Sequence, residues 1–107
     1  MNRGEVYWTS FPSGTGGEIR HDRPAVIVTN DAAIAALNRV QVVPLTSRTD
    51  RVFRGEALIT FQGGPSKAMA TQIGTIDRSR LGRRMGGITT ADMRRIDDAI
   101  REQLGLD

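Results

Sequence analysis

The chain has 107 residues, which fits one domain of the common size of about 100–150 residues. It carries a formal net charge of +3, and its 38% hydrophobic and 25% charged residues are ordinary for a globular protein. It has no cysteine and one histidine, so disulfides and cysteine-based metal sites are excluded and zinc has few ligands. The sequence has neither a run of apolar residues that would span a membrane nor a signal-peptide pattern. We therefore expect one domain over residues 1–107, located in the cytoplasm.

The basic residues are almost all arginine. Fourteen of the fifteen are Arg, and the only lysine is Lys67. Codon bias in a GC-rich genome is one explanation of this ratio. The other is functional, because the planar guanidinium group suits phosphate recognition and stacking on bases.

Taken in chain order, the apolar patterns predict a mainly β protein. Alternating or β-branched stretches indicate five strands, at residues 4–11, 23–30, 38–47, 55–61 and 66–77. Residues 31–38 fit one or two helical turns, with Asn30 or Asp31 as the N-cap. Short strands joined by glycine- and proline-rich turns favour a small antiparallel barrel or a strongly curled sheet.

A helix is expected at the C-terminal end, over residues 89–104. Thr89 with Asp92 resembles a capping box, and Gly105 is a natural stop. One stripe of the helix is apolar at helical spacing and consists of Met93, Ile96, Ala99, Ile100 and Leu104. We expect this stripe to dock on the sheet rather than to bind a partner.

Several common enzyme chemistries lack their motifs. The glycine pairs are not in a strand–GxGxxG–helix setting, so a nucleotide cofactor is not expected. No GxSxG motif accompanies the single histidine, which argues against a serine triad. The acidic residues fit solvated faces and helix caps better than a glycosidase pair.

Polar residues gather instead in three segments at predicted strand ends. The first is a glycine-containing loop with Glu18, His21 and Arg23, and the second is "PLTSR", with Thr46 and Ser47. The third runs over residues 71–84 and contains Gln72, Thr75, Asp77, Arg78 and Arg80. Hydroxyl, amide and guanidinium groups suit a phosphodiester, with Trp8, Phe11 and Phe53 as stacking surfaces for unpaired bases. On these residues alone, a plain charged surface is the competing interpretation.

The order of the segments carries a family resemblance. "RGEVYW", "GEIRHDRPAVIV", "VVPLTS", "QIGTIDRSRLG" and the terminal helix together resemble the MazF/PemK family, the toxins of type II toxin–antitoxin modules. The resemblance implies an SH3-like barrel with an added C-terminal helix, assembled as a homodimer. It also implies a sequence-specific endoribonuclease that cuts single-stranded RNA (mRNA first, with tRNA and rRNA as alternatives). No metal or other cofactor is implied, and the ends are a 2′,3′-cyclic phosphate and a 5′-hydroxyl.

The same resemblance nominates site residues. Arg23 matches the family's catalytic arginine, Thr46 its catalytic threonine, and Glu18 a loop acid of the active site. The expected RNA-binding residues are His21, Ser47, Gln72, Thr75 and Arg80. The loop departs from the common pattern, because "PSGTGGE" is one residue longer and "IRHD" is more charged.

The expected reaction uses the 2′-hydroxyl of the RNA as nucleophile. Arg23 suits the role of stabilising the negative charge of the phosphorane, and Thr46 can orient or donate to the phosphate oxygens. The general base stays open between Glu18, His21 and Arg23. Removing a proton from arginine is unfavourable, since its pKa is about 12.5 or higher, whereas histidine titrates nearest neutrality.

Two other functions compete with the nuclease. One is a CcdB-like gyrase poison, although "REQLGLD" offers no aromatic anchor at the helix end, and the other is an inert SH3-like RNA-binding module. A toxin of this family also implies an acidic, partly disordered antitoxin that covers the basic groove, in a heterohexamer-type complex.

Overall fold

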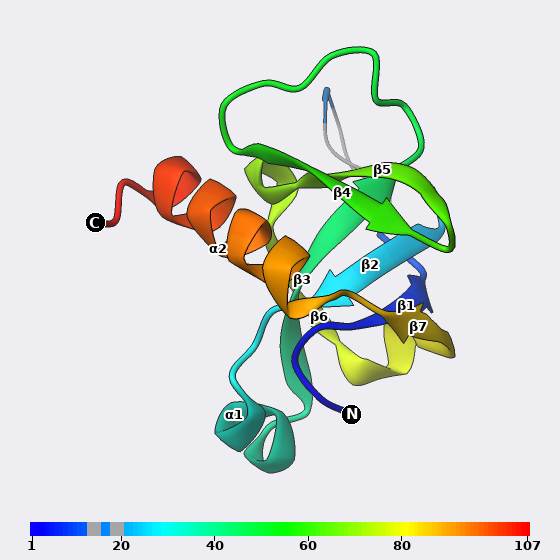
Figure 1. Cartoon of the computed structure of the whole chain (residues 1–107). Coiled ribbons are helices and arrows are strands. Elements are labelled where there is room, and N and C mark those ends of the chain that lie inside the picture. Colours follow the sequence, from blue (N-terminus) through cyan, green and yellow to red (C-terminus); the bar gives the residue numbers. More distant parts are fainter. Residues whose placement is uncertain (13–15, 18–20) are drawn as a thin grey trace.

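The computed structural model describes residues 1–12, 16–17 and 21–107 of the chain. Over these residues the chain forms seven strands, two α-helices and two 3₁₀ helices (Figure 1). The elements in order are β1 (Glu5–Thr9), β2 (Arg23–Ile27), α1 (Asp31–Ala36), β3 (Arg39–Thr46), β4 (Glu56–Phe61), β5 (Gly64–Met69), η1 (Ala70–Gln72), β6 (Gly74–Asp77), η2 (Arg78–Arg80), β7 (Leu81–Gly87) and α2 (Thr90–Leu104).

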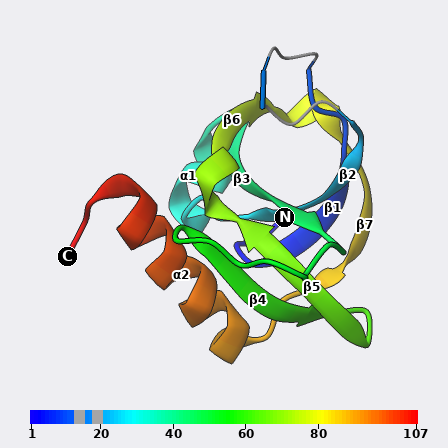
Figure 2. The ribbon, with the colours of Figure 1, turned by 90° about the horizontal axis from the view of Figure 1, so that it is seen from above.

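All strand pairs are antiparallel, and the strands form one curled sheet. The hydrogen-bonded order is β4-β5-β3-β2-β1-β7, and β6 pairs with the first half of β3. Seen from above, the ribbon curls into a ring, with α2 along its outer side (Figure 2). The expected mainly β architecture with a packed C-terminal helix is confirmed. The sheet is not closed, because its path ends at β4 and β7.

The single long strand predicted over residues 66–77 is wrong. The turn η1 divides it into β5, which pairs with the end of β3, and β6, which pairs with the beginning of β3. The corner at η1 therefore lets one stretch of chain run along both halves of β3. The strand β7 was not predicted, since "LGRRMGG" is rich in arginine and glycine, and its register with β1 shifts twice.

Both α-helices begin at the expected caps. The Asn30 side chain accepts a hydrogen bond from the backbone N–H of Ala33, and Thr89 accepts one from Asp92. Gly105 ends α2 in the left-handed conformation, with φ of 70°. Neither these helices nor any other helix of the described residues is long and apolar enough to cross a membrane.

The helix α2 docks on the sheet through most of the predicted stripe. Met93, Ile96 and Ala99 are buried and Ile100 is partly buried. Leu104 is 52% exposed, so its inclusion in the stripe was wrong. The last turns of α2 extend beyond the strands, which explains the exposure (Figure 1).

Two aliphatic clusters bury the middle of the sheet on both faces. One lies between α2 and the sheet, around Val43 and Ile96, and the other lies inside the curl, around Ile27 and Val42. Because β2 and β3 contribute to both clusters, their backbones are held from two sides. The residues at their ends, Arg23 and Thr46, are therefore attached to the most firmly packed part of the fold.

Candidate active site

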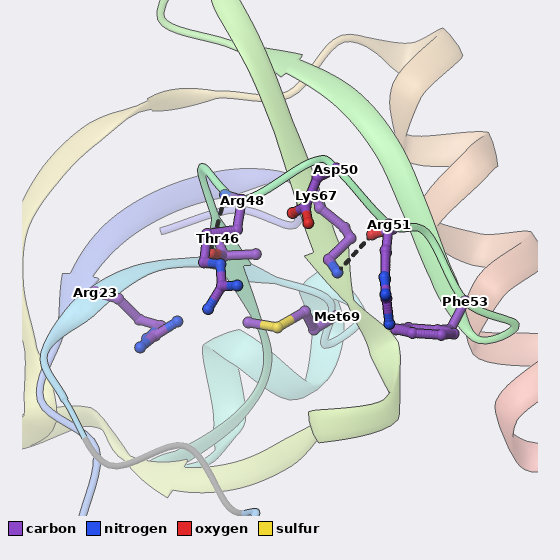
Figure 3. A pocket seen from close by; sticks show the side chains of 8 residues that line it. All are labelled: Arg23, Thr46, Arg48, Asp50, Arg51, Phe53, Lys67 and Met69. Carbon is purple, nitrogen blue, oxygen red and sulfur yellow. Dashed lines mark hydrogen bonds between the residues drawn. The ribbon is translucent and has the colours of Figure 1, made fainter.

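Arg23 and Thr46 lie side by side at one end of the sheet. Ala25 pairs with Pro44 in the antiparallel register of β2 and β3. Continuing this register by two residues places Arg23 opposite Thr46. Both side chains line one open cavity of about 620 Å³ (Figure 3). Two residues nominated from separate segments of the sequence thus share one cavity.

The rest of the cavity comes from β5 and from the 47–55 segment, the stretch of residues 47–55 that joins β3 to β4. Its other lining residues are Arg48, Asp50, Arg51, Phe53, Lys67 and Met69. Lys67 pairs with Thr46 across the β3–β5 ladder, so these two side chains leave the sheet on the same face. Four of the eight lining residues are basic and one is acidic, which gives a positive potential that suits a phosphate group.

The guanidinium group of Arg23 has one donor that is buried and unsatisfied by the described residues. Its Nε is buried and has no hydrogen-bond partner within the described residues. A buried donor without an acceptor costs about 1–3 kcal/mol. The guanidinium group as a whole lines the cavity, where its positive charge can attract a phosphate group.

Thr46 is half-buried and its hydroxyl is oriented by its own chain. Oγ1 accepts a hydrogen bond of 3.2 Å from the backbone N–H of Arg48. Within the described part of the chain the hydroxyl donates to no acceptor, so its proton is available to an oxygen of a bound group. Arg23 and Thr46 together can therefore contact one phosphate with two kinds of donor.

The loop before β2 is linked to the other side of the site by Gln72. Its Nε2 donates a hydrogen bond of 3.1 Å to the carbonyl oxygen of Gly17. His21 is exposed and lies two residues before β2. Glu18 lies outside the described residues.

The other predicted RNA-binding residues lie outside the cavity lining. Ser47 is exposed and lines a smaller cavity of about 320 Å³ that Thr46 also borders. Thr75 is opposite Gln41, whose Nε2 donates to it over 3.0 Å. Thr46 is five steps along the extended strand from Gln41, a distance of about 17 Å. Arg80 is exposed in η2, beyond Thr75.

Sequence reasoning missed most of the 47–55 segment. Its pattern "SRTDRVFRG" has no strand or helix period, although Phe53 was named as a stacking surface. The signal that was present is the arginine spacing at 48, 51 and 54 directly after the predicted threonine. The one lysine in a chain of arginines was a second signal, and it lines the cavity as Lys67.

Perturbed acids lie away from this cavity. Backbone and side-chain hydrogen bonds from Ser79 lower the pKa of Asp77, which caps η2. The backbone N–H of Asn2 is the main cause of a lowered pKa at Glu5. Among the described residues, no group of three or more histidine, aspartate or glutamate side chains is placed to hold a metal ion.

Comparison with protein families gives one match over nearly the whole chain. The model described as "PemK-like, MazF-like toxin of type II toxin-antitoxin system" matches residues 2–104. The chain is 34% identical to "Endoribonuclease MazF9" of Mycobacterium tuberculosis (strain ATCC 25618 / H37Rv), over 99% of this chain and 98% of that protein. It is 44% identical to "Probable endoribonuclease MazF1" of the same organism, over 49% of this chain and 61% of that protein.

Solved structures share the fold over the full length. An "Endoribonuclease in complex with its cognate antitoxin from Mycobacterial species" superposes with a TM-score of 0.81 at 28% identity, over 100% of this chain and 97% of that chain. MazF (Form-I) from Deinococcus radiodurans gives a TM-score of 0.85 at 21% identity, over 99% and 97%. The second likeness supports the fold alone.

Proposed function

The chain belongs to the PemK-like, MazF-like toxin family of type II toxin–antitoxin systems, and we propose that it cuts single-stranded RNA at the cavity shared by Arg23 and Thr46. As a member it is a toxin and an endoribonuclease. The observation that carries the site is the meeting of Arg23 and Thr46 in one basic cavity. Cleavage is sequence-specific and takes place in the cytoplasm.

The reaction is an attack of the RNA's own 2′-hydroxyl on the adjacent phosphorus. A bond forms between O2′ and phosphorus, the bond between phosphorus and O5′ breaks, and the ends are a 2′,3′-cyclic phosphate and a 5′-hydroxyl. Arg23 stabilises the added charge on the phosphorane oxygens, since its guanidinium group lines the cavity with a fixed positive charge. Thr46 donates its hydroxyl proton to the same phosphate and helps to align it for in-line attack.

The two proton transfers are assigned to the loop before β2. Either Glu18 or His21 takes the proton from the 2′-hydroxyl, and a proton returns to the leaving O5′. The hydrogen bond from Gln72 to the carbonyl oxygen of Gly17 ties Gly17, the residue before Glu18 in the chain, to η1. With a fixed guanidinium and a hydroxyl for the phosphate, these steps need no metal ion.

The proposal includes the partners of the toxin. A solved relative at 28% identity is a complex with its cognate antitoxin. We assign to this chain a homodimer and an acidic antitoxin segment that covers the basic cavity, in a heterohexamer-type assembly. Opposite charges make such a segment compete directly with RNA.

The test is cleavage of a long defined RNA in EDTA by purified protein. The Arg23→Ala variant is expected to lose about 10²–10³-fold in kcat, because one charge-stabilising donor is removed from the transition state. Arg39→Ala is the matched control, since Arg39 is an exposed arginine at the far end of β3. The site assignment fails if Arg23→Ala cuts at the wild-type rate.

The same assay separates the alternatives. Binding without cuts would identify an inert RNA-binding module, and DNA breaks that require gyrase would identify a gyrase poison. His21→Asn, assayed against pH, tests His21 as the general base. An unchanged pH–rate profile removes His21 and leaves Glu18, with Arg23 as the energetically unfavourable alternative.

A further inference from the structure

The only lysine of the chain is buried beside the proposed catalytic threonine. The Lys67 side chain is 10% exposed, and that of its partner Glu56 is 8% exposed. The distance from Nζ to Oε1 is 3.1 Å. A buried ion pair adds little or nothing to stability over an apolar pair of similar volume. Its presence next to Thr46 therefore calls for a reason other than stability.

The pair makes two contacts with the backbone of the 47–55 segment. Lys67 Nζ donates a hydrogen bond of 2.9 Å to the carbonyl oxygen of Arg51. Glu56 Oε1 accepts a hydrogen bond of 2.8 Å from the backbone N–H of Phe53. The Phe53 ring centroid lies 5.8 Å from Nζ, within the range of a cation–π contact. An apolar pair would offer none of these contacts.

These contacts from Lys67 and Glu56 hold a segment that belongs to no strand and no helix. Residues 47–55 form neither strand nor helix, yet they supply four of the cavity's lining residues. Figure 3 shows Lys67 reaching from β5 to Arg51, with Arg48 and Thr46 beside it. The pair thus joins β4 and β5 to the segment that carries the cavity's arginines.

We infer that the buried Lys67–Glu56 pair is a positioning device that fixes the 47–55 segment so that Arg48 and Arg51 bind the RNA backbone. This inference rests on the proposed function, because it takes the cavity as the RNA site. Lys67 and Glu56 act through the segment and not on the reacting atoms. Loss of the pair therefore weakens RNA binding while Arg23 and Thr46 keep their chemistry.

The test uses a double variant that removes both buried charges. Lys67→Met with Glu56→Gln leaves no unpaired ion and keeps an amide oxygen for the N–H of Phe53. With a short RNA substrate, we expect KM to rise about tenfold and kcat to stay within about twofold, as for lost ground-state contacts. The single variant Lys67→Arg keeps a cation at this position, and its KM should lie within about threefold of the wild-type value.

Arg3→Met is the matched control. It breaks the ion pair between Arg3 and Asp97 of α2, and with it the hydrogen bond from Arg3 Nε to the carbonyl oxygen of Val28. The side chains of Arg3 and Asp97 are 32% and 27% exposed, and both residues line a different cavity. The KM and kcat of this variant should match wild type, which would show that loss of an ion pair alone does not raise KM.

Limited trypsin digestion, carried out without RNA, shows whether the 47–55 segment is held in place. Cleavage after Arg48, Arg51 and Arg54 should be faster in the double variant than in wild type, because local opening exposes these bonds. Faster cleavage together with raised KM supports the inference. An unchanged KM overturns it, and so does a lowered kcat with unchanged KM. Raised KM with unchanged digestion also overturns it, since Lys67 would then contact RNA directly.

The two proposals fail separately. If Arg23→Ala cuts RNA at the wild-type rate, the proposed active site is wrong whatever the Lys67 variants do. If Arg23→Ala is inactive and the double variant keeps wild-type KM, the positioning role alone is wrong.

Discussion

At the scale of single residues, Arg23 and Arg78 differ in the surroundings of their guanidinium groups. Among the described residues, Nε of Arg23 and Nε of Arg78 are both buried without an acceptor, but Arg78 keeps one contact through Nη2, 2.7 Å from the carbonyl oxygen of Ile34. Arg78 is thereby tied to α1, and Arg23 is left to the cavity. In the sequence the two arginines are alike, and only their hydrogen-bond partners in the fold tell them apart.

A cluster of hydrogen bonds around Glu5 on β1 makes the free energy of unfolding depend on pH. The Glu5 carboxylate accepts hydrogen bonds from the N–H of Asn2 (2.8 Å), the hydroxyl of Tyr7 (3.1 Å) and Nε of Arg84 (3.0 Å). These contacts, with Asn2 first, hold the pKa of Glu5 below its ordinary value of 4.5. Burial, followed by the bond to Glu5, raises the pKa of Tyr7.

The sign of the pH effect follows from the lowered pKa. The unfolded chain takes up the Glu5 proton at a higher pH than the folded chain does. The contribution of Glu5 is therefore complete well above 4.5, begins to fall as the pH approaches 4.5, and is lost as the pH falls through the lower pKa of the folded state. Glu5→Gln should lower the free energy of unfolding by about 1 kcal/mol at pH 7 and by less at pH 3.5. Urea unfolding at both pH values measures this. The exposed acid variant Asp98→Asn is the control, and an equal loss for Glu5→Gln at both pH values would contradict the assignment.

Arg23 and Thr46 could be nominated from the sequence because Arg23 opens and Thr46 closes strand motifs that resemble those of the MazF/PemK family. Sequence reasoning did not reach Lys67 and Glu56, since a buried ion pair has no sequence period and needs the β4–β5 register to bring its members together. Nor did it separate Thr75 and Arg80 from the cavity. That separation depends on the corner at η1, which sends β6 to the opposite half of β3.

At the scale of elements, the packing of α2 against the beginning of β4 restricts Gly55. This residue has φ of 80°, and an added Cβ would lie 2.8 Å from Oε1 of Gln103 and 2.9 Å from Cγ2 of Thr71. Gln103 is exposed and can rotate away. Thr71 is held by its backbone N–H, which donates to the carbonyl oxygen of Gly55 over 3.1 Å. Gly55 is thus the point where β4, η1 and α2 meet.

The matched comparison is with Gly63, in the turn between β4 and β5. Its φ of 77° is almost the same, and among the described residues no atom lies within 4 Å of an added Cβ. Gly63→Ala should cost about 1–2 kcal/mol for the left-handed backbone alone. Gly55→Ala should cost about 1–3 kcal/mol more, from crowding. Urea unfolding of both variants checks this, and equal costs would show that Thr71 yields freely.

The elements themselves were predictable to different degrees. Capping residues and apolar spacing located both helices, because those signals are local. The strand β6 was predicted as part of a longer strand, and β7 was not predicted. Both form by pairing with strands that are far away in sequence, β6 with β3 and β7 with β1. Their own sequences are short or rich in glycine and arginine, so only the curled sheet makes them strands.

At the scale of the whole molecule, the fold gathers basic side chains around one cavity, although the net charge of the chain is small. The net charge is only +3 over 107 residues, yet four basic side chains and one acidic one surround the cavity. Other arginines lie on α2, where Arg101 pairs with Asp98 at 2.9 Å. We therefore expect RNA binding to follow the local charge of the cavity and not the overall charge.

Salt dependence distinguishes local from overall charge. Each phosphate contact with single-stranded nucleic acid contributes about −0.7 to the slope of log binding constant against log salt. Arg48→Ala with Arg51→Ala should make the slope shallower by about 1.4, if each arginine holds one phosphate. Arg94→Ala with Arg101→Ala removes the same charge from α2 and should leave the slope unchanged. RNA binding is measured between low and moderate salt in proteins that also carry Arg23→Ala. This substitution slows cleavage, so the RNA stays intact during the measurement. Equal slope changes for both pairs would mean that the long-range field of the whole protein, and not the cavity, governs the encounter with RNA.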